Sequence, residues 1–343
     1  MKAKLKVLIV EDSLTAQKML VSILGSDPGI EVVGVASDGE EALRLLATVN
    51  PDVITMDIHM PGMNGLDVTR QIMETRPLPI IVVSASCLVD DVGRAFKLIE
   101  AGALTAIPKP LTGTSEDFAA MSKRLVQTVK DMAAVKVVRR WPKTRAKGKT
   151  ESLEKVTPVK VIGIGASTGG PTVIHQILKD LPQTFPIPII VVQHIAPGFM
   201  PGMVEWLSKA LQLKVKVAEQ GEVVKSGIVY LAQDDRHIAV LKGGRIALSL
   251  EAPDSGHRPS VGRLFQSLAD NYGAQAAGVL LTGMGKDGAV ELLLMKEKGA
   301  LTIAQDKESS VVHGMPGEAI KLGAPRMVLS PEAISAIFKK MSK

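Results

Sequence analysis

One serine in the middle of the chain has the sequence surroundings of a catalytic nucleophile. It lies in Gly165-Ala-Ser167-Thr-Gly169, which fits the G-x-S-x-G spacing and follows an apolar run. Small flanking residues let a strand turn sharply into a helix and leave the serine hydroxyl projecting at the edge of the sheet. The first turn of that helix offers backbone N–H groups and the positive end of its dipole, which suit a developing oxyanion. The pattern therefore predicts that Ser167 is a nucleophile.

Two other interpretations of this stretch remain open at this point. Gly163-x-Gly165 could begin a dinucleotide-binding fingerprint, but the third glycine falls at Gly169, where the G-x-G-x-x-G spacing requires position 168. The glycines could also form a purely structural turn with an idle serine, because short motifs have a real false-positive rate. A general base within reach of the serine would favour the nucleophile.

Histidine is the residue that most often serves as such a base. His194 follows the apolar run 187–193, which is typical of a strand in the middle of a parallel sheet. It therefore ends that strand at the same edge of the sheet as Ser167. Placement at a strand end favours His194, and His257 is the next candidate. The other rivals are His175, His237 and His313.

A neutral imidazole base needs an acceptor on its other nitrogen. The predicted strand 277–281 leads into Thr282-Gly-Met284-Gly-Lys-Asp287-Gly, so Asp287 is a third residue near a strand end. An alternative is that Asp287 is only an N-cap or turn residue between glycines. The order serine, histidine, aspartate differs from that of the α/β-hydrolases, although triads are defined by geometry and not by chain order.

The first part of the chain contains a second group of reactive side chains. Glu11 and Asp12 follow one apolar run, and Asp57 follows another. Carboxylates that gather at one edge of a sheet repel each other unless a cation lies among them, and carboxylate oxygens are ligands that Mg²⁺ prefers. Ser84 and Lys109 end two further strands and could contact phosphoryl oxygens. We therefore predict a Mg²⁺ site at Glu11, Asp12 and Asp57, with Asp57 as phosphate acceptor.

These residues carry a resemblance to a known domain family. Glu11-Asp12, Asp57 with Met60-Pro-Gly62, Ser84 and Lys109-Pro110 together resemble the receiver domain of two-component response regulators. The resemblance implies a flavodoxin-like fold in which Asp57 is phosphorylated and Ser84 and Lys109 act as switch residues. Mg²⁺ would be the cofactor of that phosphorylation.

The elements that must position these residues alternate between strands and helices. Strands are predicted at 6–10, 30–36, 53–56, 80–83 and 105–107, with a final helix at 115–135, and the pattern resumes with strand 159–164. Such alternation predicts α/β architecture, in which ligands lie at the carboxyl ends of parallel strands. We expect two doubly wound parallel-sheet domains: a flavodoxin-like receiver at 1–130, a linker at 131–157 and a Rossmann-like three-layer αβα hydrolase domain at 158–343.

Composition narrows the class of protein further. A chain of 343 residues with 46% hydrophobic content predicts about two globular domains. No apolar run reaches the length of a membrane span, no secretory segment is evident, and the single cysteine, Cys87, excludes an internal disulfide, so a cytoplasmic protein is expected. The net charge of +6 equals the excess of eight basic over two acidic residues between 136 and 158. This basic segment predicts a solvated linker and not a nucleic-acid surface.

The second half resembles a more specific family. Gly165-Ala-Ser167-Thr-Gly-Gly170, Gln193-His194, His257-Arg-Pro-Ser260-Val, Thr282-Gly-Met-Gly-Lys-Asp287-Gly and Ala304-Gln-Asp resemble the catalytic domain of the chemotaxis protein-glutamate methylesterases. With the receiver in front, the resemblance covers nearly the whole chain.

The resemblance implies hydrolysis of glutamate γ-methyl esters on chemoreceptors and deamidation of receptor glutamines. Ser167 would attack, His194 would transfer the proton and Asp287 would orient the imidazole. Backbone N–H groups at Thr168 and Met284 are the oxyanion candidates, and ester hydrolysis needs no metal or organic cofactor.

The same family implies two protein partners. Chemoreceptors would be the substrate, and the chemotaxis histidine kinase would phosphorylate Asp57. The unphosphorylated receiver would cover the active-site face, and phosphorylation would weaken that contact. We expect a monomer that neither inserts into the membrane nor binds nucleic acid. Two alternatives remain at this stage: a methylesterase-like regulator with a target outside chemotaxis, and a non-enzymatic response regulator that binds a partner.

Overall fold

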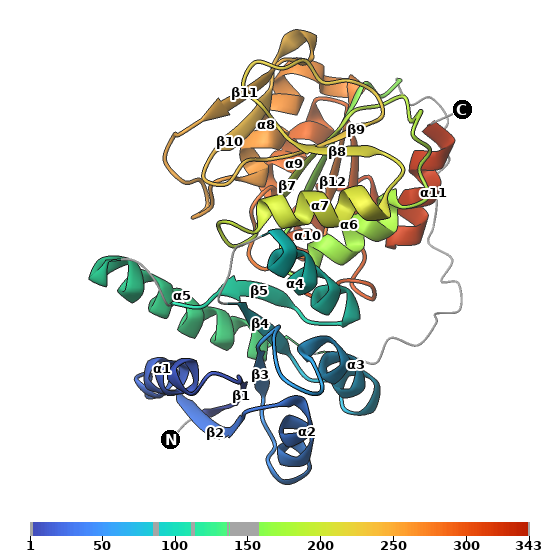
Figure 1. The fold of residues 1–343 in the computed structure, drawn as a ribbon. Coiled ribbons are helices and arrows are strands. Elements are labelled where there is room, and N and C mark those ends of the chain that lie inside the picture. The colour runs from blue at the N-terminus through green and yellow to red at the C-terminus, as the bar shows by residue number, and fades with distance from the viewer. Residues whose placement is uncertain (1–2, 85–88, 111–113, 136, 138–157, 342–343) are drawn as a thin grey trace. The chain divides into compact units, whose positions relative to one another are not determined.

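The computed structural model describes residues 3–84, 89–110, 114–135, 137 and 158–341 (Figure 1). The chain divides into two compact units, Met1–Lys143 and Thr144–Lys343. Cys87 and nearly all of the predicted linker lie outside the described residues. Each unit contains one large parallel sheet, so the two units are described separately.

The first unit is built on a five-stranded sheet in which every pairing is parallel. Its strands, in spatial order, are β2 (Ile30–Ala36), β1 (Leu5–Val10), β3 (Val53–Met56), β4 (Ile80–Ser84) and β5 (Thr105–Pro108). This 2-1-3-4-5 order is the flavodoxin-like arrangement, as the sequence predicts. Strands β3 and β4 are buried along their whole length, because helices cover both faces of the sheet.

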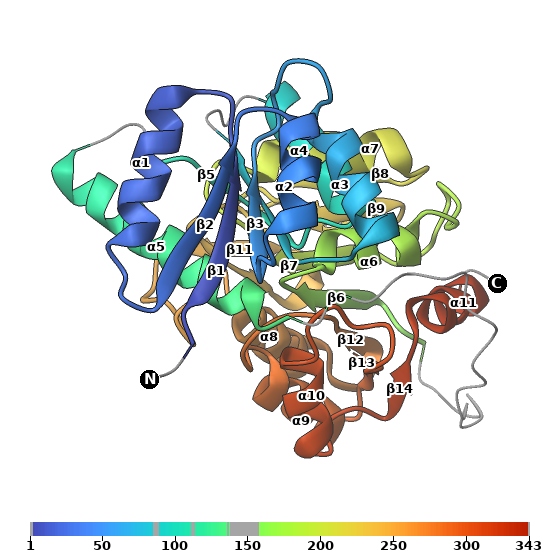
Figure 2. The same cartoon turned by 90° about the horizontal axis from the view of Figure 1, so that it is seen from below.

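Helices cover the two faces of this sheet in two groups (Figure 2). On one face lie α1 (Leu14–Gly25) and α5 (Ser115–Ala133), and on the other α2 (Gly39–Thr48), α3 (Gly65–Thr75) and α4 (Val89–Ala101). Side-chain caps start several of them: Ser13 accepts the N–H of Ala16 before α1, and Asp38 accepts the N–H of Glu41 before α2. These caps fix where the loops after β1 and β2 end.

The second unit is built on a seven-stranded sheet, also parallel throughout. Its strands, in spatial order, are β14 (Met327–Leu329), β13 (Leu301–Gln305), β12 (Ala276–Leu280), β6 (Val161–Ala166), β7 (Ile189–Gln193), β9 (Ile228–Leu231) and β8 (Lys214–Val217). Strands β12, β6 and β7 are neighbours in the middle of the sheet, and every residue in them is buried. Their carboxyl ends therefore meet at one edge.

Helices again form a layer on each face of this sheet (Figure 2). One layer contains α6 (Gly170–Leu178), α7 (Met200–Ala210) and α11 (Pro331–Met341), and the other α8 (Val261–Tyr272), α9 (Ala289–Glu297) and α10 (Met315–Lys321). A separate antiparallel hairpin, β10 (His237–Val240) and β11 (Ile246–Ser249), packs on α8. Short 3₁₀ turns occur at Lys242–Gly244 and Gly273–Gln275. The predicted fold class, two doubly wound α/β domains, is confirmed.

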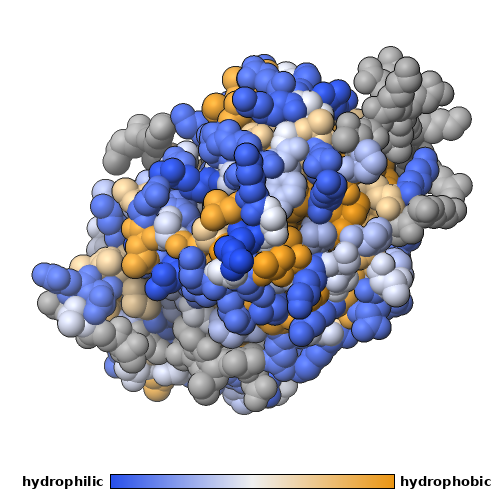
Figure 3. Space-filling model, turned by 90° about the horizontal axis from the view of Figure 1, so that it is seen from above, coloured by the Kyte–Doolittle hydropathy of each residue, from blue (hydrophilic) through white to orange (hydrophobic). Residues whose placement is uncertain are grey.

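None of the helices in the described residues combines the length and apolar character needed to cross a membrane. On the face shown in Figure 3, hydrophobic side chains lie in patches separated by hydrophilic ones.

Candidate active site

Ser167 lies in the turn between β6 and α6, where the sequence predicts the nucleophile. Its backbone N–H donates to the carbonyl of Thr282 at 3.0 Å, and its carbonyl accepts the N–H of Gly170 at 2.8 Å. The residue is half-buried, and no residue described in the structure accepts or donates a hydrogen bond at its hydroxyl. The turn therefore holds the backbone firmly while the hydroxyl stays available.

The segment after β12 approaches this turn very closely at Gly283. A Cβ atom on Gly283 would lie 2.7 Å from the Cβ of Ser167, which is closer than such atoms pack. Only glycine can occupy this position without moving Ser167. The glycine after Thr282 in the sequence motif thus allows the loops after β6 and β12 to meet.

His194 and Asp287 form the pair that the sequence predicts. His194 follows β7, and its N–H donates to the carbonyl of Ala166 at 2.9 Å, which places it beside the end of β6. Its ring Nε2 lies 2.9 Å from the Asp287 carboxylate Oδ2. The two side chains are 9% and 3% exposed, so little water competes for this hydrogen bond.

The second ring nitrogen of His194 is chemically informative. Nδ1 is buried and has no hydrogen-bond partner among the residues in the described ranges. A carboxylate can only accept, so Nε2 carries the proton in the pair with Asp287, and the lone pair of the neutral ring is on Nδ1. In this structure Nδ1 is therefore the nitrogen available for proton transfer.

Asp287 is fixed by the first turn of α8 as well as by His194. Its carboxylate accepts the hydroxyl of Ser260 at 2.9 Å, the N–H of Val261 at 2.7 Å and the N–H of Gly262 at 3.0 Å. Burial acts to raise the pKa of Asp287, but the hydrogen bond and charge of His194 and these N–H groups outweigh it, so the pKa is lowered. The positive end of the α8 dipole acts in the same direction.

The oxyanion candidates have the free donors that such a role needs. Among the hydrogen bonds of the described part of the chain, none is donated by the backbone N–H of Thr168 or of Met284. Met284 lies one residue beyond Gly283 and is 44% exposed. Both amides therefore lie next to the Ser167 turn with their donors unused.

In the first unit, the predicted acidic cluster comes together at the ends of β1 and β3. The N–H of Asp57 donates to the carbonyl of Val10 at 2.9 Å, which places Asp57 beside the end of β1. Glu11, Asp12 and Asp57 each offer a carboxylate oxygen, and these oxygens lie within 4.8 Å of one another. Such a set of hard oxygen donors fits a divalent cation of the Mg²⁺ class.

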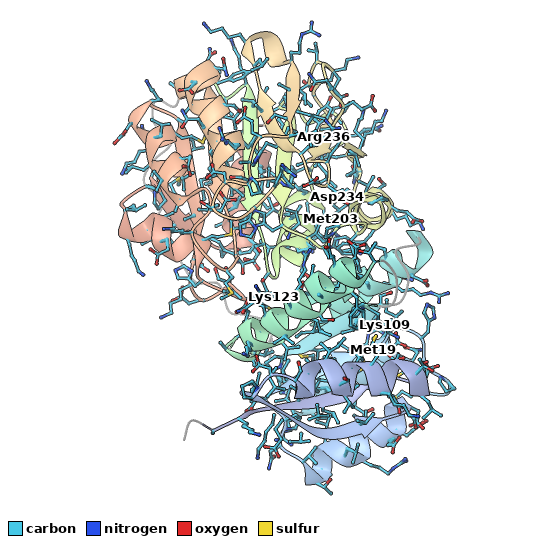
Figure 4. All side chains as sticks on the ribbon, turned by 90° about the vertical axis from the view of Figure 1, so that its left-hand side faces the viewer. Met19, Lys109, Lys123, Met203, Asp234 and Arg236 are labelled. Atoms are coloured by element: carbon cyan, nitrogen blue, oxygen red, sulfur yellow. The ribbon has the colours of Figure 1, made fainter. Side chains whose placement is uncertain are left out.

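Lys109, labelled in Figure 4, follows β5 directly and joins this cluster. Its ammonium lies 2.6 Å from Glu11 Oε2 and 2.9 Å from Asp57 Oδ2, and the side chain is buried. Burial raises the pKa of Glu11, as does the charge of Asp57, against the opposing effect of Lys109. Ser84, the last residue of β4, is also buried, and its carbonyl accepts the N–H of Lys109 at 2.7 Å.

Comparison with known proteins identifies the family. Residues 162–338 match the CheB methylesterase family, and residues 7–121 match the response regulator receiver domain. The chain belongs to the CheB methylesterase family. A protein-glutamate methylesterase/protein-glutamine glutaminase of Nitrosospira multiformis is 49% identical over 97% of this chain and 95% of its own length. One from Syntrophus aciditrophicus is 48% identical over 98% of both chains.

A solved structure supports the CheB fold assignment for the second unit. The methylesterase catalytic domain of Thermotoga maritima CheB aligns with a TM-score of 0.51 and 38% identity, and the match covers 54% of this chain and 98% of that one. The prediction of a protein-glutamate methylesterase and protein-glutamine glutaminase with a receiver in front is therefore confirmed, and the non-enzymatic alternative loses its support.

The rival histidines of the CheB domain have other contacts. His257 stacks on the His194 ring with centroids 3.9 Å apart and planes 8° apart. His237 Nδ1 accepts the N–H of Ser260 at 3.2 Å, and His313 Nδ1 lies 3.3 Å from the Ser310 hydroxyl. His175 packs edge-on against Trp206 at 5.3 Å. Within the described part of the chain, His194 is thus the histidine hydrogen-bonded to Asp287.

Two features of this CheB site were not foreseen from the sequence. Gly288, and not Asp287, is the N-cap of α9, so the interpretation of Asp287 as a helix cap is wrong. Ser260 caps α8 and donates its hydroxyl to Asp287, and neither contact was predicted. A serine directly before a helical apolar pattern is a recognisable N-cap signal and could have revealed the start of α8.

Proposed function

We propose that this chain hydrolyses glutamate γ-methyl esters of chemoreceptors, and deamidates receptor glutamines, with Ser167, His194 and Asp287 as catalytic residues. The observation that carries the assignment is the His194–Asp287 hydrogen bond of 2.9 Å. It leaves Nδ1, which is buried and has no hydrogen-bond partner among the described residues, as the base of a site that also holds Ser167. The relatives named above support the substrate class. Because the methylated helices of chemoreceptors are cytoplasmic, we place the enzyme in the cytoplasm. We also propose that it is a monomer.

The chemistry follows from these groups as an acyl transfer in two halves. His194 Nδ1 takes the Ser167 proton as the hydroxyl oxygen attacks the ester carbonyl, and the N–H groups of Thr168 and Met284 stabilise the oxyanion. The tetrahedral intermediate expels methanol, which receives the proton from His194, and leaves an acyl-serine. Water then attacks under the same base and releases the glutamate. Asp287 holds the ring and stabilises the imidazolium throughout.

In the receiver, we propose that a chemotaxis histidine kinase phosphorylates Asp57 and so regulates the esterase. Glu11, Asp12 and Asp57 would hold Mg²⁺, which supplies neutralisation of the phosphoryl charge. Lys109 already contacts Asp57 at 2.9 Å and, with Ser84, would contact the phosphoryl oxygens. Regulation of this kind typically couples two sites by about 1 to 3 kcal/mol, or about 5- to 150-fold.

The decisive test of the function is methanol release from receptor membranes that carry methylated glutamates. We expect release with the purified protein and an increase of about 5- to 150-fold when a small phosphodonor and Mg²⁺ are added. Release from model methyl esters but not from receptors would move the target outside chemotaxis. Absence of any ester hydrolysis would overturn the proposed activity itself.

Phosphorylation gives a separate prediction. Acetyl phosphate with Mg²⁺ should label the wild-type receiver, and Asp57→Asn should abolish the label, because an amide cannot form the acyl phosphate. Chelation of Mg²⁺ should also abolish it, since Glu11, Asp12 and Asp57 place several negative charges around the incoming phosphoryl group. Radiolabel incorporation or intact-protein mass measures both effects.

A matched control distinguishes loss of a carboxylate from the acidic cluster from loss of a carboxylate elsewhere in the receiver. Asp67→Asn removes one carboxylate from an exposed position in the first turn of α3 and should keep full labelling. Persistent labelling of Asp57→Asn would place the acceptor elsewhere, with Asp12 as the first residue to test.

A further inference from the structure

Gln193 connects the nucleophile and the base through its side-chain amide. It is the last residue of β7 and is 2% exposed. Its Nε2 donates to the carbonyl of Ser167 and to the carbonyl of His194, each at 2.8 Å. The opposite orientation of the amide would bring Oε1 against two carbonyl oxygens, so these two bonds fix it. Both amide protons are therefore committed to the backbone of catalytic residues.

The oxygen of this amide, Oε1, does not stabilise the site in the way that the two hydrogen bonds of Nε2 do. Oε1 is buried and accepts no hydrogen bond from the residues that the structure describes. It is also tightly packed, because a Cβ atom on Gly170 would lie 2.2 Å from it. An apolar side chain of similar size would avoid burying an unpaired acceptor. The two donated bonds are thus the distinctive contribution of a glutamine here.

The bond to Ser167 acts on the neighbouring amide through the geometry of the peptide group. The carbonyl of Ser167 and the N–H of Thr168 belong to one planar trans peptide, so they point in opposite directions. A donor that fixes the carbonyl also fixes the direction of the N–H. The Ser167 carbonyl accepts a second bond, from the N–H of Gly170 at 2.8 Å. The two hydrogen bonds accepted by the Ser167 carbonyl therefore hold the Thr168 N–H so that it points away from Gln193.

The second oxyanion candidate has the same arrangement. The carbonyl of Gly283 shares a peptide with the N–H of Met284, and it accepts the N–H groups of Gly314 at 3.0 Å and Met315 at 2.9 Å. Hydrogen bonds accepted by the carbonyl of a peptide polarise the peptide and strengthen its N–H as a donor, by about 10 to 30% per bond. The N–H groups of Thr168 and Met284 thus each belong to a peptide whose carbonyl accepts two hydrogen bonds.

We infer that Gln193 is a positioning residue of the oxyanion hole, which aims and polarises the Thr168 amide and ties it to the His194 backbone. This inference rests on the proposed function, because it takes Thr168 and Met284 as the oxyanion donors. Three of the four bonds to the two carbonyls come from backbone groups, and the fourth comes from Gln193. The arrangement can therefore be tested by changing one side chain.

The test is Gln193→Met, which keeps the size of the side chain and removes both donors. We expect kcat for methyl-ester hydrolysis to fall about 10- to 100-fold, less than the 10²- to 10³-fold typical for loss of an oxyanion donor, because the amide itself remains. KM should stay within about twofold, since the bond matters most when the oxyanion develops. The rate at which a fluorophosphonate labels Ser167 should fall by a similar factor, because that reaction also places negative charge at the phosphoryl oxygen.

Gln233→Met is the matched control. Gln233 also follows a strand of this sheet, β9, and its Nε2 donates to the carbonyl of Ala218 at 2.8 Å, whereas none of the hydrogen bonds between described residues joins its side chain to the Ser167 turn. It should keep wild-type kcat. If Gln193→Met does not fold, Gln193→Asn keeps an amide that is too short to bond both carbonyls, and should give a smaller loss of kcat with the same unchanged KM.

The outcomes separate this inference from the proposed function. A wild type that hydrolyses receptor esters together with a Gln193→Met variant of unchanged kcat and labelling rate would overturn only the positioning role. A rise in KM at constant kcat, or an equal loss in Gln233→Met, would also overturn it. A wild type without esterase activity would instead overturn the function on which it rests.

Discussion

Replacing Ser167 with alanine is expected to lower methanol release by about 10³- to 10⁶-fold, the range typical for loss of a triad member. The substitution removes the oxygen that forms the acyl-enzyme, and the oxyanion donors alone cannot replace it. The fold should be unaffected, because the hydroxyl has no hydrogen-bond partner in the described residues and the turn is held by backbone bonds. Methanol release and fluorophosphonate labelling measure the loss, and circular dichroism measures the fold.

Two comparisons make this experiment specific. His194→Ala and the double variant should be about as inactive as Ser167→Ala, because the residues act as one unit. Ser226→Ala removes a hydroxyl that donates to the carbonyl of Pro186 at 2.6 Å, and it should keep full activity. If Ser167→Ala retained near-normal release, another nucleophile would have to be sought.

The proposed catalytic residues could be located from the sequence because each follows an apolar run. Parallel strands end at one edge of their sheet, so residues after such strands meet there whatever their separation in the chain. Ser167, His194 and Asp287 come after β6, β7 and β12, which are adjacent. The same reasoning placed Asp57 beside Asp12, because β1 and β3 pair directly.

Contacts made by irregular backbone could not be located in this way. The N–H groups of Val261 and Gly262 reach Asp287 only because α8 begins beside the end of β12, and no periodic pattern predicts that approach. The orientation of the His194 imidazole could not be predicted either, because the pairing of Nε2 with Asp287 depends on the rotation of the side chain. Four strands of the second sheet, β8, β9, β13 and β14, were not predicted, and the two at its edges, β8 and β14, are short and only partly buried.

Replacing Asp287 with asparagine is expected to lower kcat by about 10⁴-fold while leaving the site nearly isosteric. The carboxylate accepts four hydrogen bonds: from His194, Ser260, Val261 and Gly262. The two backbone donors of α8 contact different carboxylate oxygens, Gly262 at Oδ1 and Val261, together with His194, at Oδ2, so an amide loses one of them in either orientation. When its oxygen keeps the Oδ1 place beside Gly262 and Ser260, its NH₂ group faces His194 Nε2. That nitrogen can then accept only if the ring proton moves to Nδ1, and the lone pair needed for the Ser167 proton is lost.

The pH dependence of stability provides an independent readout of the same carboxylate. Because the pKa of Asp287 is lowered in the folded protein, its ionised form stabilises the fold above the unfolded-state pKa, and this contribution is lost as the pH falls through the lower folded-state pKa. Asp287→Asn should therefore be less stable than wild type at pH 7 and should lose less stability on acidification. Thermal unfolding at a series of pH values measures this difference.

Asp254→Asn is the matched control for the Asp287 experiment. Asp254 is a partly exposed acid near α8 that pairs with Arg263 at 3.5 Å, and among the described residues its carboxylate makes no hydrogen bond to His194. Its loss should leave kcat close to wild type. Asp287→Asn with near-normal kcat would mean that His194 keeps its proton on Nε2 without the carboxylate. The hydrogen bonds from the first turn of α8 to Asp287 would then contribute only to stability. Another group would have to set the tautomer of His194, and the stacked ring of His257 would be the first to examine.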